Sequence, residues 1–272
     1  MMTMKSGNRL PDTHHRNWSI TGGCVRGAAH VKNDMPCQDA LRIENTKRYP
    51  IVSISDGHGS AKCPYSDEGS KAAVDTACTV FGSILESKSD PFHTISANKD
   101  IWLPKQIEQH WKGSVYAIHK DKERKEDFSY ELYGATLLTL VAADDFVFAL
   151  QLGDGDILSV EDESRVDWAI PPDDSLGPET HSLCQDDCWQ YMKTRIVPLS
   201  PGVKSPMFFM STDGYANSFY NDDGFKQAGT DFYKLWHNEG LGFIEDNLEG
   251  WLMESSAQGS GDDISMALVV NI

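Results

Sequence analysis

Residues 51–59 read IVSISDGHG, a compact apolar run that stops at an aspartate beside a glycine. The alternation of Ile and Val with small residues predicts a buried β-strand over 51–55. The two glycines that follow force a turn directly after it. Because a strand inside a sheet delivers its terminal side chain to the sheet edge with little freedom, Asp56 is expected at such an edge.

The same pattern occurs three more times along the chain. Asp154 follows the apolar run 146–152, Asp213 follows 207–210, and Asp262 stands just before 264–270. If these strands are neighbours and their ends share one edge, the carboxylates converge, and such a cluster is costly without a counter-charge. Hard divalent cations such as Mg²⁺ or Mn²⁺ suit all-oxygen ligands, and two of them a few Å apart make a phosphoryl-transfer site.

Two neighbours of Asp56 fit this hypothesis. Gly57 lets the backbone approach closely, so its carbonyl could serve as a further ligand. His58 is near enough to protonate a leaving oxygen. Taken singly, an Asp-Gly pair is more often a plain turn, as residues 144–145 and 222–224 illustrate, and a single His is more often structural. The joint occurrence favours the metal site.

The remaining pattern predicts an α+β chain of antiparallel sheets with helices packed outside. Strands are expected at 136–141, 146–152, 157–160, 207–210 and 264–272, and helices at 68–85, 102–119 and 231–254. Residues 87–100 are expected to be a polar connection. Residues 167–205 are long, irregular and rich in Pro and Asp, which is typical of a functional flap.

Composition excludes several classes of function. The chain has 272 residues with 24 Lys and Arg against 41 Asp and Glu, so its net charge is 24 − 41 = −17. Such a surface repels nucleic acid and anionic lipid and suits cations or a basic partner. No apolar run is long enough to span a bilayer. Residues 1–17 are polar, lack the apolar core of a signal peptide and are expected to form a flexible tail, which favours a cytoplasmic protein. The six cysteines lack the CxxC spacing of a zinc site.

Several motifs together resemble the metal-dependent serine/threonine protein phosphatases of type 2C, in the form of a bacterial-like member. They are DGHG at 56–59, GAT at 134–136, GDGD at 153–156, STDG at 211–214 and DDIS at 262–265, preceded by QDA at 38–40. The resemblance covers residues 18–272 and implies a single domain. It further implies a central β-sandwich of two antiparallel sheets flanked by helices in four layers, αββα, with a two-metal centre at one edge.

The resemblance also assigns roles to particular residues. Asp56 would bridge two Mg²⁺ or Mn²⁺ ions, and the Gly57 carbonyl would bind one of them. Asp213 and Asp262 would hold the other ion, and Asp39 would complete the first ion's shell. Asp154, with Asp213, would match the ligands of a third, weaker ion. His58 matches the proposed general acid of the family, whereas Thr136 has a structural role.

The sequence departs from the family pattern in three places. The Arg that grips the substrate phosphate is expected about five residues before Asp39, where this chain has Asp34. Arg26, His30 or Lys32 are the alternatives, and the sequence does not choose among them. The last motif reads Asp262-Asp263 where the family usually has Asp-Asn, which adds an acid beside the metal. The Gly-Asp-Ser-Arg pattern of the family is GDGD at 153–156.

The favoured function is hydrolysis of phosphoserine or phosphothreonine in a protein, by attack of a water that bridges two metal ions. The partner would be a phosphorylated protein, either a cognate Ser/Thr kinase or its target, and the enzyme is expected to be a monomer. Residues 167–205 would select the substrate. One alternative is a catalytically weak or silent regulator that keeps the fold and binds a kinase or phosphoprotein. A two-metal phosphodiesterase or nuclease is disfavoured because the surface is acidic and the chain has no basic stripe.

Overall fold

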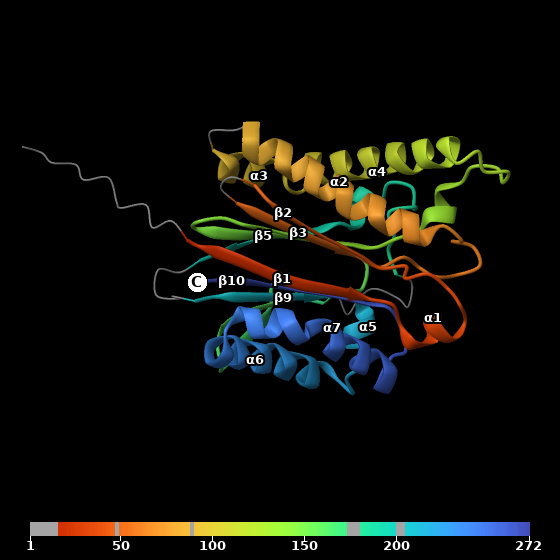
Figure 1. The fold of residues 1–272 in the computed structure, drawn as a ribbon. Helices are drawn as coiled ribbons and strands as arrows, with labels where there is room; N and C mark the ends of the chain where they lie inside the picture. The colour runs from red at the N-terminus through yellow and green to blue at the C-terminus, as the bar shows by residue number, and fades with distance from the viewer. Residues whose placement is uncertain (1–15, 47–48, 88–89, 173–179, 200–204) are drawn as a thin grey trace, which may run out of the picture.

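The computed structural model describes residues 16–46, 49–87, 90–172, 180–199 and 205–272. In these residues two five-stranded antiparallel sheets lie face to face, and helices cover the outer side of each (Figure 1). The predicted α+β sandwich of four layers is confirmed. The expected tail at 1–17 lies almost entirely outside the described residues.

The first sheet contains both the first and the last described strand. Its order is β1 (Trp18–Val25), β10 (Ile264–Asn271), β9 (Met207–Ser211), β6 (Asp156–Asp162) and β7 (Arg165–Trp168). Every residue of β10 is buried. A strand that is apolar on both faces requires cover on both sides, which the second sheet and the outer helices provide.

The second sheet is built from the middle of the chain. Its order is β2 (Ala40–Asn45), β3 (Pro50–Ser55), β4 (Leu137–Ala142), β5 (Phe146–Leu152) and β8 (Lys193–Pro198). All residues of β3, β4 and β5 are buried. Apolar side chains of both sheets, such as Ile54, Leu138, Phe208 and Val269, form the core between them.

Helices complete the two outer layers. Those over the second sheet are α2 (Ser66–Ser87), α3 (Pro91–Asn98) and α4 (Trp102–Asp121), while α5 (Asp213–Ala216), α6 (Asp222–Glu239) and α7 (Leu241–Gln258) lie over the first (Figure 1). A short helix, α1 (Ala28–Lys32), joins β1 to β2, and two 3₁₀ turns span Tyr130–Tyr133 and Cys188–Tyr191. In the part of the chain that the structure describes, no helix combines the length and the apolar character needed to cross a membrane.

Two of the predicted helical boundaries are wrong. Residues 87–100, expected to be a polar connection, contain α3, whose first turn is capped by the Asp90 side chain accepting from the His93 N–H at 2.9 Å. The single helix expected at 231–254 is two helices, because Gly240 between α6 and α7 takes a φ of 87° that helical residues cannot adopt.

The expectation of an irregular segment over 167–205 is also partly wrong. Residues Lys193–Pro198 form β8, which pairs with β5 at the edge of the second sheet. Residues 173–179 and 200–204 lie outside the described part of the chain, so the role of this segment as a flap stays a prediction. Its described portion contacts the sheet edge, because the Leu183 N–H donates to the Ala135 carbonyl at 2.9 Å.

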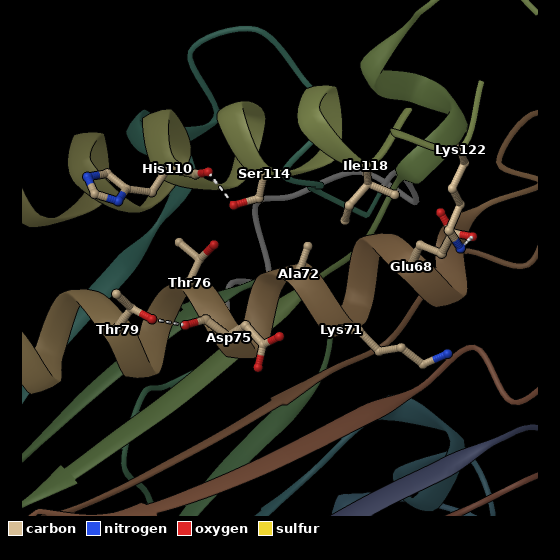
Figure 2. A pocket seen from close by; sticks show the side chains of 10 residues that line it. All are labelled: Glu68, Lys71, Ala72, Asp75, Thr76, Thr79, His110, Ser114, Ile118 and Lys122. Atoms are coloured by element: carbon tan, nitrogen blue, oxygen red, sulfur yellow. Dashed lines mark hydrogen bonds and ion pairs between the residues drawn. The ribbon is translucent and has the colours of Figure 1, made fainter. Parts of the chain in front are cut away.

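A pocket of about 330 Å³ lies in the outer helical layer between α2 and α4 (Figure 2). Glu68, Asp75, His110 and Lys122 are among the side chains that line it. None of the acids predicted to bind metal is among them. This hollow therefore belongs to the helix pair and not to the sheet edge.

Gly69 in α2 provides a test of how tightly this helical layer is packed. A Cβ at Gly69 would lie 1.9 Å from the Tyr133 carbonyl oxygen, and the Gly69 carbonyl accepts from the Trp111 indole N–H at 2.9 Å. We expect Gly69→Ala to lower the free energy of unfolding by about 1–3 kcal/mol or more, because backbone must move to admit the methyl group. Urea unfolding followed by circular dichroism measures the change.

Gly113→Ala in α4 is the matched control. It is exposed in the middle of a helix, and a Cβ there meets nothing within 4 Å. This substitution should raise the free energy of unfolding by up to about 1 kcal/mol. Equal effects of the two substitutions would contradict the close approach of α2 to the Tyr130–Tyr133 turn.

Candidate metal centre

Strand register brings the predicted acids to one end of each sheet. In the second sheet Ala40, which starts β2, pairs with Ser55, which ends β3, so Asp39 and Asp56 are neighbours. In the first sheet Met266, near the start of β10, pairs with Ser211, which ends β9. Asp262 and Asp213 therefore leave the same end of that sheet. Antiparallel pairing thus explains why acids far apart in sequence meet.

The two sheets contribute to one cluster. Carboxylate oxygens of Asp56, Asp154 and Asp213 all lie within 4.8 Å of one another. Asp56 and Asp154 extend from the second sheet, whereas Asp213 opens the short helix α5 after β9. The Asn217 amide donates to Asp213 Oδ2 at 3.0 Å, and the Thr180 hydroxyl donates to Asp154 Oδ2 at 2.5 Å.

Asp39 and Asp262 are the two predicted acids outside this group of three, and both interact with the charge of Asp56. Asp39 is only 4% exposed, and its Oδ2 accepts from the Thr212 hydroxyl at 2.8 Å. Thr212 is itself fixed across the sheet, because its Oγ1 accepts from the Ser265 N–H at 2.9 Å. Asp262 is half exposed and repels the charges of Asp56 and Asp213.

The electrostatics of the cluster favour a bound cation. Burial, followed by repulsion from Asp213, Asp154 and Asp262, holds the pKa of Asp56 well above its usual value. Burial and the charge of Asp56 likewise raise the pKa of Asp39, and burial with repulsion from Asp154 and Asp262 raises that of Asp213 to about 6. No Lys or Arg is paired with these carboxylates in the described residues. An oxygen-only donor set with unbalanced negative charge fits a hard divalent cation.

Gly57 is required by a close approach of the backbone. A Cβ at this position would lie 2.6 Å from the Ser66 carbonyl oxygen and 2.7 Å from that of Gln38. Gly57 also forms an isolated bridge with Ala135. The residue therefore lets the Asp56 turn press against the segment that carries Asp39.

Thr136 fixes the backbone of Asp56. Its hydroxyl accepts from the Asp56 N–H at 3.0 Å, and its own N–H donates to the Asp56 carbonyl at 2.8 Å. This agrees with the structural role that the GAT motif suggested. His58 is half buried, and its N–H donates to the Gly134 carbonyl at 3.1 Å. Burial lowers the pKa of His58, while the charge of Asp154 acts in the opposite direction.

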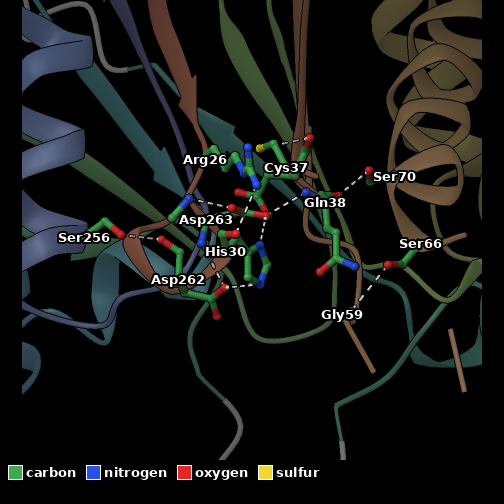
Figure 3. A network of polar contacts seen from close by, with 12 residues as sticks. Arg26, His30, Cys37, Gln38, Gly59, Ser66, Ser70, Ser256, Asp262 and Asp263 are labelled. Atoms are coloured by element: carbon green, nitrogen blue, oxygen red, sulfur yellow. Dashed lines mark hydrogen bonds and ion pairs between the residues drawn. The ribbon is translucent and has the colours of Figure 1, made fainter. Parts of the chain in front are cut away.

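Asp263 is not an additional acid of the cluster, contrary to the expectation from sequence. Its Oδ1 accepts from the Gly27 N–H at 2.6 Å, and its Oδ2 accepts from the Gln38 N–H at 2.6 Å. His30 Nδ1 lies 2.7 Å from the same Oδ2 (Figure 3). Asp263 therefore joins the start of β10 to both ends of the loop that carries α1. Nothing local in the sequence signals this, since the partners lie more than 200 residues away.

The three candidates for phosphate binding occupy different settings. His30 is 14% exposed and engaged by Asp263. Arg26 Nη2 donates to the His30 carbonyl at 3.1 Å and lies 3.6 Å from the fully exposed carboxylate of Asp34, while its buried Nε has no acceptor. Lys32 is exposed at the end of α1. All three lie on the loop held by Asp263 (Figure 3 shows Arg26 and His30 beside it).

A second hollow, of about 360 Å³, adjoins the carboxylate cluster. Asp154 and Asp213 belong to both. Two further acids, Asp156 and Asp222, line it, and no Lys or Arg does. Its walls include the aromatic rings of Trp168, Phe219, Tyr220 and Phe225. The cluster thus opens onto an acidic and aromatic pocket.

Removal of the adjacent acids Asp262 and Asp263 should change the stability of the metal-free protein by very different amounts. Asp263→Ala leaves two buried backbone N–H groups without an acceptor, so we expect it to lower the free energy of unfolding by about 2–4 kcal/mol. Asp262→Ala removes a charge that repels Asp56 and Asp213, which offsets the loss of the Asp262 Oδ1 that accepts from the Asp263 N–H at 2.8 Å, so stability should stay nearly equal. Urea unfolding in the presence of chelator measures both.

Variants at the same two positions should also differ in their response to a divalent cation. Asp262→Ala should reduce the rise in melting temperature that Mg²⁺ produces, because a predicted ligand is lost. Asp263→Asn, which keeps one acceptor, serves as the conservative control and should retain most of that rise. The different roles assigned to the two acids would be refuted if Asp262→Ala strongly lowered the free energy of unfolding while Asp263→Ala left it unchanged.

Comparison with known proteins agrees with this geometry. A family model described as "Protein phosphatase 2C" matches residues 26–253. A "Serine/threonine-protein phosphatase 3" of Escherichia coli (strain K12) is 21% identical over 145 residues, 52% of this chain and 53% of that protein. The match thus spans about half the length of this curated relative.

Solved structures share the fold. The structure of the S. agalactiae serine/threonine phosphatase is similar, with a TM-score of 0.62 and 18% identity, over 93% of this chain and 99% of that one. A bacterial serine phosphatase has a TM-score of 0.63 and 16% identity, over 95% and 98%. Since the family model covers most of the sequence and the fold agrees along nearly the whole length, the chain belongs to the protein phosphatase 2C family.

Proposed function

We propose that this protein is a metal-dependent phosphatase that hydrolyses phosphoserine and phosphothreonine in proteins. The observation that carries the proposal is the convergence of the carboxylates of Asp56, Asp154 and Asp213 within 4.8 Å, in a chain of the protein phosphatase 2C family. Carboxylates confined in this way without a cationic side chain are suited to metal-assisted transfer of a phosphoryl group to water.

Six residues would hold the metal ions. Asp56 would bridge two Mg²⁺ or Mn²⁺ ions, with Asp39 and the Gly57 carbonyl on one side and Asp213 and Asp262 on the other. Asp154, with Asp213, would hold a third, weaker ion. When bound, such ions neutralise phosphate oxygens and ready a water for attack on phosphorus. Thr136 and Thr212 support the set, because one fixes the Asp56 backbone and the other fixes the Asp39 carboxylate.

His58 would protonate the departing Ser or Thr oxygen. The residue directly follows the Asp56-Gly57 turn, and its imidazole lies beside Gly134, where an added Cβ would meet His58 Cδ2 at 2.7 Å. That contact restricts the ring to one side of the turn. Because burial lowers the pKa of His58, the protonated form that the acid role requires is favoured at a lower pH than in an exposed His.

Arg26 is the residue that we assign to the substrate phosphate. Its exposed ion-pair partner, Asp34, offers a weak competing contact, and its buried Nε has no acceptor in the described structure. An Arg with free donors can bind two phosphate oxygens at once. His30 and Lys32 are the alternatives, of which His30 is already engaged by Asp263.

The substrate would be a phosphorylated protein with basic residues near the phosphate. The net charge of −17 disfavours polyanionic targets, and the pocket beside the centre adds Asp156 and Asp222 to Asp154 and Asp213. A Lys or Arg side chain could place its charge near these acids and its apolar stem against Trp168 or Phe225. The protein that supplies this substrate would be a Ser/Thr kinase or its target.

Removal of a bridging carboxylate should abolish activity without unfolding the protein. We expect Asp56→Asn and Asp213→Asn to lower kcat/KM for p-nitrophenyl phosphate in Mn²⁺ by about 100-fold or more, because several kcal/mol of transition-state stabilisation are lost. Chelator should have a similar effect on the unaltered protein. Circular dichroism checks that both variants remain folded.

The matched control is Asp223→Asn, an exposed acid in the first turn of α6 outside the cluster. It should keep the rate of the unaltered protein. Phosphoserine, phosphothreonine and phosphotyrosine peptides, each with and without a neighbouring Arg, then define the substrate class. Tight binding of a phosphopeptide with no Mn²⁺-dependent turnover would instead support the silent regulator.

The role of His58 predicts a dependence on the leaving group. His58→Ala should slow the hydrolysis of poor leaving groups, such as phosphothreonine, about tenfold or more while changing p-nitrophenyl phosphate much less, because a good leaving group needs no proton. A series of aryl phosphates measures the slope. Equal losses along the whole series would rule out the acid role.

A further inference from the structure

Two thiols meet beneath the loop that joins β1 to β2. Cys24 lies in β1, Cys37 lies just before Asp39, and their sulfurs are 3.8 Å apart. Both residues are half buried, so neither is sealed inside the apolar core. Neither sulfur belongs to the cluster of Asp56, Asp154 and Asp213, although the Cys37 thiol donates to the Asp39 carbonyl at 3.9 Å, and no step of the proposed hydrolysis uses a thiol.

The backbone around this pair is already drawn together. The Asp263 carboxylate accepts from the Gly27 N–H, three residues after Cys24, and from the Gln38 N–H, directly after Cys37 (Figure 3). The two ends of the 24–37 loop are therefore held in place by the same side chain. A disulfide requires the sulfurs to close from 3.8 Å to about 2.05 Å, which is a small movement for side chains so placed.

We propose that Cys24 and Cys37 form a redox modification site that hydrogen peroxide converts to a disulfide. The thiolate of one cysteine attacks a peroxide oxygen, which gives a sulfenic acid and releases hydroxide. The second thiol then attacks the sulfenic sulfur, so the S–S bond forms and water leaves. The sum is two thiols and one H₂O₂ to one disulfide and two H₂O, and a dithiol such as dithiothreitol reverses it by exchange.

Closure of this bond would act on the segment before Asp39. Cys24 is fixed because β1 pairs with β10, where Cys24 lies opposite Ser265. Cys37 stands outside the strands, so most of the movement falls on Cys37 and on Gln38 and Asp39 after it. Because Asp39 adjoins Asp56 and is proposed as a metal ligand, the disulfide would lower phosphatase activity. This second step rests on the proposed function.

Peptide mass analysis tests the site without reference to activity. Trypsin cuts after Arg16, Arg26, Lys32 and Arg42, so Cys24 lies in peptide 17–26 and Cys37 in peptide 33–42, each with no other cysteine. The Mg²⁺-loaded protein is treated with hydrogen peroxide, its free thiols are blocked with N-ethylmaleimide, and it is digested. We expect the two peptides to be joined, and dithiothreitol to separate them.

Three variants sharpen the result. Cys24→Ser and Cys37→Ser should each lose the joined peptides, whereas Cys184→Ser, which removes another half-buried thiol, should keep them. The proposal would be overturned if the unaltered protein gave no joined peptides after peroxide. In that case both thiols would be found alkylated, or one of them would carry sulfinic acid. Joining of Cys37 to a cysteine other than Cys24 would do the same.

The hydrolysis rate of p-nitrophenyl phosphate tests the regulatory step. Peroxide should lower it about tenfold or more, since displacement of a catalytic group by about 1 Å can have effects of that size, and dithiothreitol should restore it. Cys24→Ser should keep its rate in peroxide. An unchanged rate in protein shown to carry the disulfide would overturn the regulatory step. A protein that is inactive before peroxide, but gives joined peptides after it, would refute the proposed function and leave the modification site established.

Discussion

Repulsion among the carboxylates of Asp56, Asp154 and Asp213 is the constraint that governs this structure, because three acidic oxygens lie within 4.8 Å of one another. Burial of Asp56 and Asp39 increases the cost, since it removes the water that would screen them. The described chain places no Lys or Arg against them. Such a centre is unfavourable until a cation binds, so the fold supplies the energy that holds the acids together.

Rigid secondary-structure elements hold the acids in place against this repulsion. Asp56, Asp154 and Asp213 each follow a strand whose residues are all buried between two covered layers, and the backbone there has few alternatives. Threonines perform the same task on both sides of the sandwich: Thr136 fixes Asp56, and Thr212 fixes Asp39. Gly214 makes room for the Asp262-Asp263 backbone, because a Cβ at Gly214 would lie 2.1 Å from the Asp263 carbonyl oxygen. The motif glycines are thus needed for packing around the acids.

Sequence patterns predicted those parts of the fold in which local signals are strong. Buried strands such as 51–55 and 146–152 are mostly apolar runs, and the acids that follow them are visible without a structure. The strand β8 was missed because it is an edge strand that begins with Lys193, Thr194 and Arg195, so it lacks an apolar signal. The break at Gly240 was missed because one glycine in a helical pattern has no unique interpretation from sequence. Asp263 was taken for a metal-side acid, since only the tertiary fold brings Gly27 and Gln38 to it.

The 24–37 loop combines features that the sequence shows only as separate residues. It carries Arg26 and His30, it ends two residues before Asp39, and Asp263 closes it through one carboxylate. Any change in the loop is therefore transmitted to the acid cluster through a short path of covalent and hydrogen bonds. The thiols of Cys24 and Cys37 lie at the base of this path, where a bond between them shortens the loop without breaking the sheets. The same connection that positions Asp39 thus makes the centre sensitive to chemistry at the thiols.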